Sequence, residues 1–187
     1  MKRILAIGTV TVMVLAFTGV AVYAEDAPKQ VYDLAQTKLA DLGKSTLIIA
    51  AVKEQNAKNM TLDSIKEMDE KWKKTPGIAD FMKPLMETGC APNLKQIQTM
   101  NPFYAEIFVM DNQGANVCQT DKTSDYWQGD EAKFQKSFND GNGAVFVDEV
   151  EFDDSTQAYI SQVSVPVMEN GKAIGAITFG IDIDKLN

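Results

Sequence analysis

The chain has 187 residues, a formal net charge of −8 and a hydrophobic content of 45%. Such acidity argues against nucleic acid and anionic membrane surfaces as partners, because both are recognised by basic patches. It is equally compatible with a cationic ligand and with simple solubility. The sequence contains no histidine, which removes the commonest metal ligand and the commonest general base.

The N-terminus has the three parts of a secretory signal. Lys2 and Arg3 precede an uncharged apolar run over residues 4–22, and small or tolerated residues lead to Ala24. Cleavage there would leave 163 of the 187 residues, a normal size for one domain, and would change the net charge from −8 to −10. We predict a signal peptide over residues 1–24 and a periplasmic mature protein. The alternative is an uncleaved inner-membrane anchor, because the apolar run is long enough to span a thin bilayer.

The two cysteines, Cys90 and Cys118, are predicted to form a disulfide. An isolated pair in an oxidising compartment favours this interpretation, and the loop closed would span 28 residues. The alternative is a redox or metal pair, but the sequence has no Cys-x-x-Cys spacing.

The first half of the mature chain has helical periodicity. Apolar residues at spacings of three and four predict one long helix over residues 31–57. A second helix should begin after Thr61, which offers N-cap chemistry, and should end at Thr75-Pro76-Gly77. Shorter helical pieces are expected over residues 78–85 and 93–100, the first of them interrupted by Pro84.

The second half has extended periodicity with one helical insertion. Strands are expected over residues 104–110, 115–119, 144–152, 158–168 and 173–183, with a short helix over 131–138. Asn170-Gly171 favours a type I′ hairpin turn between the last two strands. This segregated order predicts an α+β fold with a five-stranded antiparallel sheet, the long N-terminal helix on one face and the insertion on the other.

The same order of segments resembles a Cache domain, the extracellular PAS-like sensor fold also called PDC. The segments are IFVMDNQGANVCQT, SDYWQGDEAKF, GAVFVDEVEFD and QAYISQVSVPVMENGKAIGAITFGIDI, in this order after a long leading helix. The resemblance runs from about residue 31 to the C-terminus. It implies one sensor domain over residues 25–187, with a helical part over 25–102 and a sheet part over 103–187.

The resemblance also implies where a ligand would lie, between the sheet and the loop-helix insertion. Carried over by position, Tyr126 and Trp127 form the aromatic pair of the loop, Phe146 or Asp148 comes from the following strand, and Asp182 comes from the last strand. Amino-acid-binding Cache domains carry an arginine shortly before the aromatic pair. Here Ser124 and Asp125 stand in its place, which puts an amino acid bound in the usual way in doubt.

The chemistry of these residues points to a positively charged ligand. Aromatic faces attract ammonium groups, and carboxylates form charge-assisted hydrogen bonds with them. An amine, a polyamine or a quaternary ammonium would suit the set Tyr126, Trp127 and Tyr159 with Asp125, Asp148 or Asp182. The alternative is structural: the two loop aromatics cap the core, Asp125 is the N-cap of the insertion helix, and Asp148 is solvated.

The sequence argues against an enzyme. It has no Gly-x-Ser-x-Gly elbow, phosphate-binding loop or zinc spacing, and we expect no cofactor and no metal. The acidic cluster at 148–154 could hold calcium, but strand alternation sends its members to both faces.

We therefore expect a periplasmic ligand-binding sensor that acts through a membrane partner such as a histidine kinase, chemoreceptor or cyclase. No second long apolar run follows the signal, so signalling should pass through another protein. Homodimers through the N-terminal helix are common in such domains. The alternative is a ligand-free interaction or regulatory protein.

Overall fold

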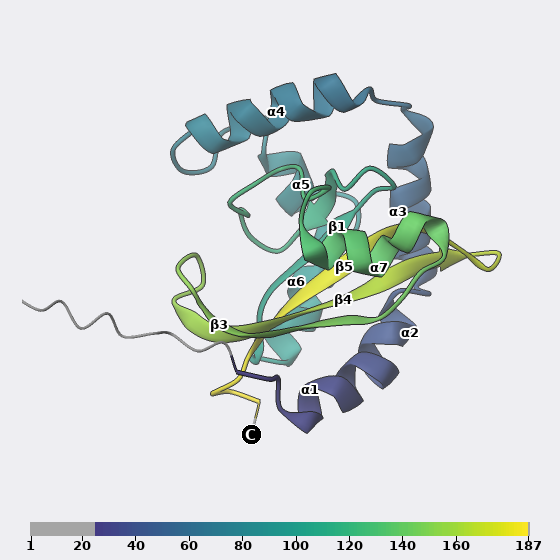
Figure 1. Cartoon of the computed structure of the whole chain (residues 1–187). Coiled ribbons are helices and arrows are strands. Elements are labelled where there is room, and N and C mark those ends of the chain that lie inside the picture. The colour runs from purple at the N-terminus through teal and green to yellow at the C-terminus, as the bar shows by residue number, and fades with distance from the viewer. Residues whose placement is uncertain (1–24, 187) are drawn as a thin grey trace, which may run out of the picture.

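The structure, a computed structural model, describes residues 25–186, so the predicted signal peptide lies outside the described residues. The expected long helix over residues 31–57 is wrong as a continuous element (Figure 1). Its first part comprises α1 (Lys29–Leu34), the π-helical η1 (Ala35–Leu39) and α2 (Ala40–Leu42), and its second part is α3 (Thr46–Ala57).

Gly43 explains the break between the two parts. A Cβ atom at this position would overlap the carbonyl oxygen of Pro166, so only glycine allows the chain to approach the sheet this closely. The Gly43 carbonyl also accepts a hydrogen bond from the Met168 backbone N–H at 3.0 Å. Tertiary contact with the sheet therefore interrupts a pattern that is helical by periodicity.

The second helix is confirmed. Helix α4 spans Leu62–Lys74, and the Thr61 hydroxyl accepts a hydrogen bond from the Ser64 backbone N–H at 3.2 Å, as expected of an N-cap. The short helices α5 (Lys83–Glu87) and α6 (Ala91–Met100) follow. Helix α5 is shorter than expected because Pro84 occupies its first turn, where proline is tolerated, and cannot sit further inside.

The predicted five-stranded antiparallel sheet is confirmed, with the strand order β2-β1-β5-β4-β3. The strands are β1 (Tyr104–Met110), β2 (Asn116–Gln119), β3 (Phe146–Asp153), β4 (Ala158–Glu169) and β5 (Lys172–Asp182), and helix α7 (Ala132–Phe138) with η2 (Asn139–Gly141) is inserted between β2 and β3. Asn170 and Gly171 both have positive φ, 49° and 80°, as the type I′ turn requires.

Strand alternation gives the sheet two different faces. On one face, Val163, Ile177 and Phe179 pack against α1, η1 and α3 in the main core. On the other, Phe108 and Met110 pack against Phe134 of α7. The helices thus cover both faces as expected, and the α+β architecture is consistent with a Cache/PAS-like fold (Figure 1).

A disulfide joins the helical half of the chain to the sheet half. Cys90, next to the start of α6, is bonded to Cys118 of β2 with a Cα–Cα distance of 5.8 Å, which confirms the predicted pair. Among residues 25–186, no helix has both the length and the apolar character needed to cross a bilayer.

Candidate functional site

A glycine in the middle of the sheet makes room for the central residues of the site. Glu106 of β1 and Gln162 of β4 both pair with Gly180 of β5, one from each side. Because Gly180 has no side chain, its neighbours lean over it, and the Gln162 amide donates a hydrogen bond to Glu106 Oε1 at 3.2 Å. A Cβ atom on Gly180 would lie 2.8 Å from Glu106 Cγ, so glycine is needed for this arrangement.

The face of the sheet that carries this pair is hollowed by three adjoining cavities of about 200, 50 and 250 Å³. Lys133, Asp153 and Gln162 line both the first and the second, and Glu106 and Ser155 line both the second and the third. We call this continuous depression the acidic cleft. It lies between the sheet, helix α7 and the loop that follows β2.

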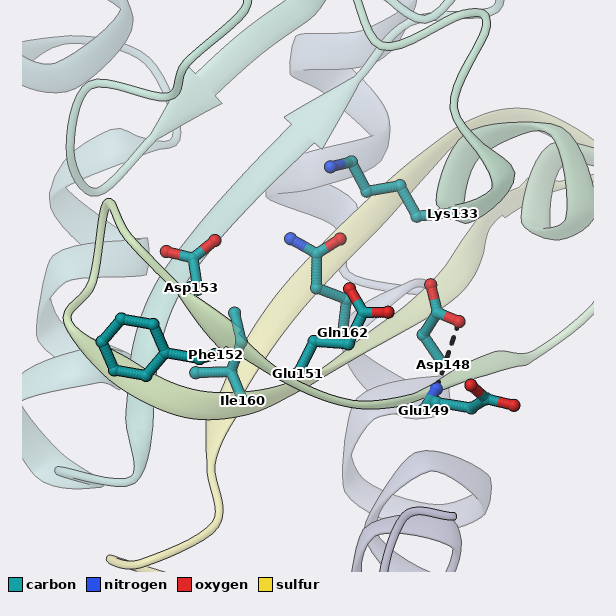
Figure 2. A pocket seen from close by; sticks show the side chains of 8 residues that line it. All are labelled: Lys133, Asp148, Glu149, Glu151, Phe152, Asp153, Ile160 and Gln162. Carbon is teal, nitrogen blue, oxygen red and sulfur yellow. Dashed lines mark hydrogen bonds between the residues drawn. The ribbon is translucent and has the colours of Figure 1, made fainter. Parts of the chain in front are cut away.

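Carboxylates outnumber cations along the acidic cleft. The acidic lining residues are Glu106, Asp121, Asp148, Glu149, Glu151, Asp153 and Asp182, and the basic ones are Lys122, Lys133 and Lys185. Lys122 donates to the Thr75 carbonyl, and Lys185 pairs with Asp182. Lys133 reaches from α7 toward the space around Gln162, where Asp148, Glu151 and Asp153 gather (Figure 2). The cleft therefore has the electrostatic character of a cation site.

Glu106 is the most perturbed of these carboxyl groups. Burial raises its pKa to about 7, the nearby carboxylates of Asp153 and Asp121 add to the rise, and Lys133 and the hydrogen bond from Gln162 oppose it. Near neutral pH, Glu106 is thus divided between its neutral and ionised forms. A cation entering the cleft would favour the ionised form.

Two of the predicted ligand residues line the acidic cleft, at different places. Asp148 lies in the first cavity, close to Lys133. Asp182 lies in the third, where it is buried and its carboxylate accepts from the backbone N–H groups of Asp184 and Lys185 at 3.1 and 3.3 Å. The Lys185 ammonium forms an ion pair with Oδ2 of Asp182 at 2.6 Å. Asp182 is thus already bonded within the protein.

The aromatic pair of the loop lies outside the acidic cleft. The Asp69 carboxylate of α4 accepts from the backbone N–H groups of Tyr126 and Trp127 at 2.9 and 3.1 Å, which fixes the loop. Tyr126 is buried against Trp72 in a separate cluster. The ring of Trp127 is covered by the ammonium of Lys66, 4.7 Å from its centroid.

The remaining predicted residues are also dispersed. Asp125 forms an ion pair with Lys73 at 2.9 Å, and Glu131 rather than Asp125 is the N-cap of α7, so the capping alternative is wrong. The ring of Phe146 lies under the Lys136 ammonium at 4.4 Å. Tyr159 is half exposed and packs edge-on against Phe152. The structure therefore does not assemble the seven residues in one cavity.

Sequence reasoning missed three central members of the site, Glu106, Lys133 and Gln162, and considered Asp153 only as part of the acidic cluster at 148–154. Glu106 carried a detectable signal, because it is the only charged residue in the segment Tyr104–Met110, which is otherwise aromatic or aliphatic. Its partner across the sheet could not be found, since pairing over Gly180 depends on strand register. Among the described residues, no group of three or more Cys, Asp or Glu side chains is placed to hold a metal ion.

Comparison with known proteins gives structural neighbours only. No family model matches the sequence, and no curated protein matches it. The sensory domain of the Campylobacter jejuni chemoreceptor Tlp3 is 16% identical, with a TM-score of 0.44, over 84% of this chain and 64% of that one. The sensor domain of the V. cholerae histidine kinase DctB is 13% identical, with a TM-score of 0.41, over 84% and 55%.

A third neighbour is the ligand-binding domain of the Pseudomonas aeruginosa PAO1 amino acid chemoreceptor PctC in complex with GABA. It is 14% identical, with a TM-score of 0.42, over 85% of this chain and 63% of that one. The chain thus spans less than two thirds of each of these proteins. Two of these neighbours are domains of chemoreceptors, and one is the sensor domain of a histidine kinase.

Proposed function

We propose that the chain is a periplasmic Cache-type sensor domain that binds a small amine in the acidic cleft and acts through a membrane signalling partner. The observation that carries the proposal is the half-buried Glu106, held over Gly180 by Gln162 in a cleft where carboxylates are in excess. The amine is bound and not transformed. The partner would be a histidine kinase, chemoreceptor or cyclase, as the resemblance implies.

The ligand would be held by hydrogen bonds to ionised acceptors. An ammonium group in the middle cavity of the cleft would lie near the carboxylates of Glu106 and Asp153, which are acceptors in a partly desolvated space. Lys133 serves as the internal cation while the cleft is empty. No carboxylate of the described residues lies within 4.0 Å of its ammonium, which instead lies 5.7 Å from the centroid of the Phe108 ring.

The cleft suits an amine better than an amino acid carrying its own carboxylate. Of the cleft lysines, Lys122 and Lys185 are already engaged with Thr75 and Asp182. Lys133 alone would have to offset several carboxylates if an anionic group entered. A mono- or diamine without a carboxylate avoids that repulsion.

The test is thermal unfolding of the protein purified from the periplasm, with a panel of monoamines, diamines, quaternary ammonium compounds and dicarboxylates. A ligand at one hundred times its Kd stabilises by about 2.7 kcal/mol, which raises Tm by about 5–10 °C for a chain of this size. We expect amines to raise Tm and dicarboxylates to have no effect. The Glu106→Gln variant should lose most of the amine shift, whereas Glu67→Gln, exposed on α4, should keep it.

Three results would contradict the proposal. A larger shift with a dicarboxylate than with any amine would show that the cleft selects anions. An unchanged amine shift in Glu106→Gln would place the amine elsewhere. No shift with any compound would favour a ligand-free periplasmic interaction protein.

A further inference from the structure

Strand β3 forms an open edge of the sheet (Figure 1). It is the last strand in the order β2-β1-β5-β4-β3, so β4 pairs with only one of its sides. Among residues 25–186, the other side pairs with Glu25 alone, whose carbonyl accepts from the Val150 N–H at 2.7 Å. Inward and outward backbone groups alternate along a strand, so the N–H and C=O of Phe152 point to the same open side.

The predicted mature chain has no residue of its own to pair with the edge beside Phe152. The bridge between Glu25 and Val150 is antiparallel, and from Glu25 the described chain turns away into α1. A chain that extended the bridge in the opposite direction would lie beside Phe152. Because Glu25 is the first residue after the predicted cleavage, this stretch of the edge offers its backbone groups to another chain.

Two exposed aromatic rings lie at this open edge. Phe152 and Tyr159 are partners across β3 and β4, and their rings pack edge-on with centroids 5.3 Å apart. They are 46% and 52% exposed, and in Figure 2 the Phe152 ring points away from Lys133. Alternation puts Tyr159 on the same face of β4 as the buried Val163 and Val165. The apolar face of β4 therefore continues beyond the part that the helices cover, and it ends in rings of a kind enriched at protein interfaces.

The charges along this edge are negative and unpaired. Every charged residue of β3 is acidic. The exposed carboxylates of the edge, none of which has a cationic side chain within 4.0 Å among residues 25–186, are those of Glu25, Glu149, Glu151 and Asp154. Two copies of this chain joined at the edge would bring like charges together, and an anionic membrane would be repelled. Charge complementarity favours a basic partner.

We infer that the open edge of β3 is a docking site for an extended, basic segment of a partner protein. The segment adds to the sheet as a further strand beside Phe152, and its main chain forms the missing ladder of hydrogen bonds. Its Lys or Arg side chains meet the carboxylates of Glu149 and Glu151 and lie over the rings of Phe152 and Tyr159, because both kinds of group attract cations.

The docking edge adjoins the acidic cleft without depending on it. Glu149, Glu151 and Phe152 also line the first cavity of the cleft, whereas Glu106 lies on β1, two strands further into the sheet. Pairing of a strand with β3 does not require an amine in the cleft. Glu106→Gln should therefore bind the basic segment as the unmodified protein does, even though it should lose the amine.

The experiment uses a short synthetic peptide of alternating lysine and valine as the probe, with the protein purified from the periplasm. One matched peptide has glutamate in place of lysine, and another keeps every lysine but has proline in place of its central valine, which removes a ladder N–H. We expect the lysine-valine peptide to bind at least about tenfold more tightly than either matched peptide. It should also protect the Phe152 amide from hydrogen exchange, and added salt should weaken its binding.

Two variants test the rings and the charges of the edge separately. Phe152→Ser and the double variant Glu149→Gln/Glu151→Gln should each weaken binding of the lysine-valine peptide by about three- to tenfold. Their matched controls are Tyr32→Ser, at an aromatic residue of α1 that is 43% exposed, and Glu67→Gln on α4, and both should bind as the unmodified protein does. All these positions are exposed, so the substitutions should leave the fold intact.

The inference is overturned if the proline peptide binds as tightly as the lysine-valine peptide, or if the Phe152 amide gains no protection. It is also overturned if Tyr32→Ser weakens binding as much as Phe152→Ser does. Protection of Phe152 by dimers of the protein alone would assign the edge to a second copy, and protection by phosphatidylcholine vesicles would assign it to a lipid surface. Either result overturns the inference.

The same samples separate this inference from the proposed function. Peptide binding with no amine binding in any sample contradicts the proposed function alone. Amine binding with no peptide binding contradicts the docking site alone.

Discussion

Glu106 is the one charged residue of strand β1, and the groups around its carboxyl determine the pKa of that carboxyl. Across Gly180, Gln162 donates one hydrogen bond to the Glu106 carboxyl. The carboxyl is otherwise largely shielded from water, and the carboxylate of Asp153 adds a like charge nearby. Burial and like charge both favour the neutral form. An ionisable group with a pKa perturbed in this way is typical of binding and functional sites.

The stability of the empty protein should depend on the ionisation of Glu106. Its pKa is raised from 4.5 to about 7, so the folded state binds more protons than the unfolded state between these values. Stability should therefore fall as the pH rises from 4.5 through 7. Chemical denaturation across this pH range should show that the free energy of unfolding falls less in Glu106→Gln than in the unmodified protein. At pH 8 the variant should be the more stable of the two.

The control for this experiment is Glu67→Gln, which changes an exposed carboxylate on α4 and should leave the pH dependence as it is. A steeper loss of stability with pH in Glu106→Gln than in the unmodified protein would contradict the assignment.

Gly180→Ala should damage the site through Glu106. The added Cβ would lie 2.8 Å from Glu106 Cγ, and overpacking of this kind typically costs about 1–3 kcal/mol. The free energy of unfolding should fall by this amount, and amine binding should weaken. The double variant Glu106→Ala/Gly180→Ala measures the coupling and should recover part of the loss relative to the sum of the single variants. Strict additivity would show that the clash lies elsewhere.

At the scale of the elements, two segments have conformations that are set by contacts with other elements, one with the sheet and one with helix α4. The leading helix breaks at Gly43, where the chain meets Pro166 of β4. The loop of Tyr126 and Trp127 is held by Asp69 of α4, which turns both rings away from the acidic cleft. In both cases the partner comes from a distant part of the sequence.

Gly43→Ala should destabilise the protein by about 1–3 kcal/mol, because its Cβ would meet the backbone of Pro166, which cannot rotate aside. Thermal unfolding measures the change. Ser45→Ala is the local control, since Ser45 is the N-cap residue of α3 but its side chain forms no capping hydrogen bond. A larger loss in Ser45→Ala than in Gly43→Ala would contradict this account of the break.

At the scale of the whole molecule, the helical half borders a cavity of about 310 Å³ lined by residues of α3, α4, α5 and β2, and the sheet half carries the acidic cleft. The Cys90–Cys118 bond ties the two halves together at β2. The loop after β2 borders both hollows, with Thr123 and Gln128 on the side of the acidic cleft and Tyr126 on the side of the helical cavity. The disulfide therefore anchors the strand from which this shared wall extends.

Removal of the disulfide should cost about 3–4 kcal/mol of unfolding free energy, as expected for a closed loop of 28 residues if the effect is mainly on the unfolded chain. The double variant Cys90→Ala/Cys118→Ala should show this loss in denaturant titration. A reducing agent should lower the Tm of the unmodified protein and leave that of the variant unchanged. Equal stability of the two proteins would show that the bond does not constrain the unfolded chain.

Local sequence determined the elements and most of their bounds. The strand Tyr104–Met110, the cap at Thr61 and the Asn170-Gly171 turn follow from alternation, capping and backbone preference, which depend on near neighbours. The cysteine pair followed from composition and compartment. The resemblance in segment order proposed Asp148 and Asp182 as ligand residues, and the structure places both in the lining of the acidic cleft.

Only the tertiary structure decided which side chains share a cavity. Glu106 and Gln162 are 56 residues apart and meet because both strands flank Gly180. The rings of Trp127 and Phe146 are covered by the protein's own Lys66 and Lys136. The physical reason is that a cavity is formed where strand register and helix packing leave space, and neither quantity is encoded in the spacing of residues along one segment.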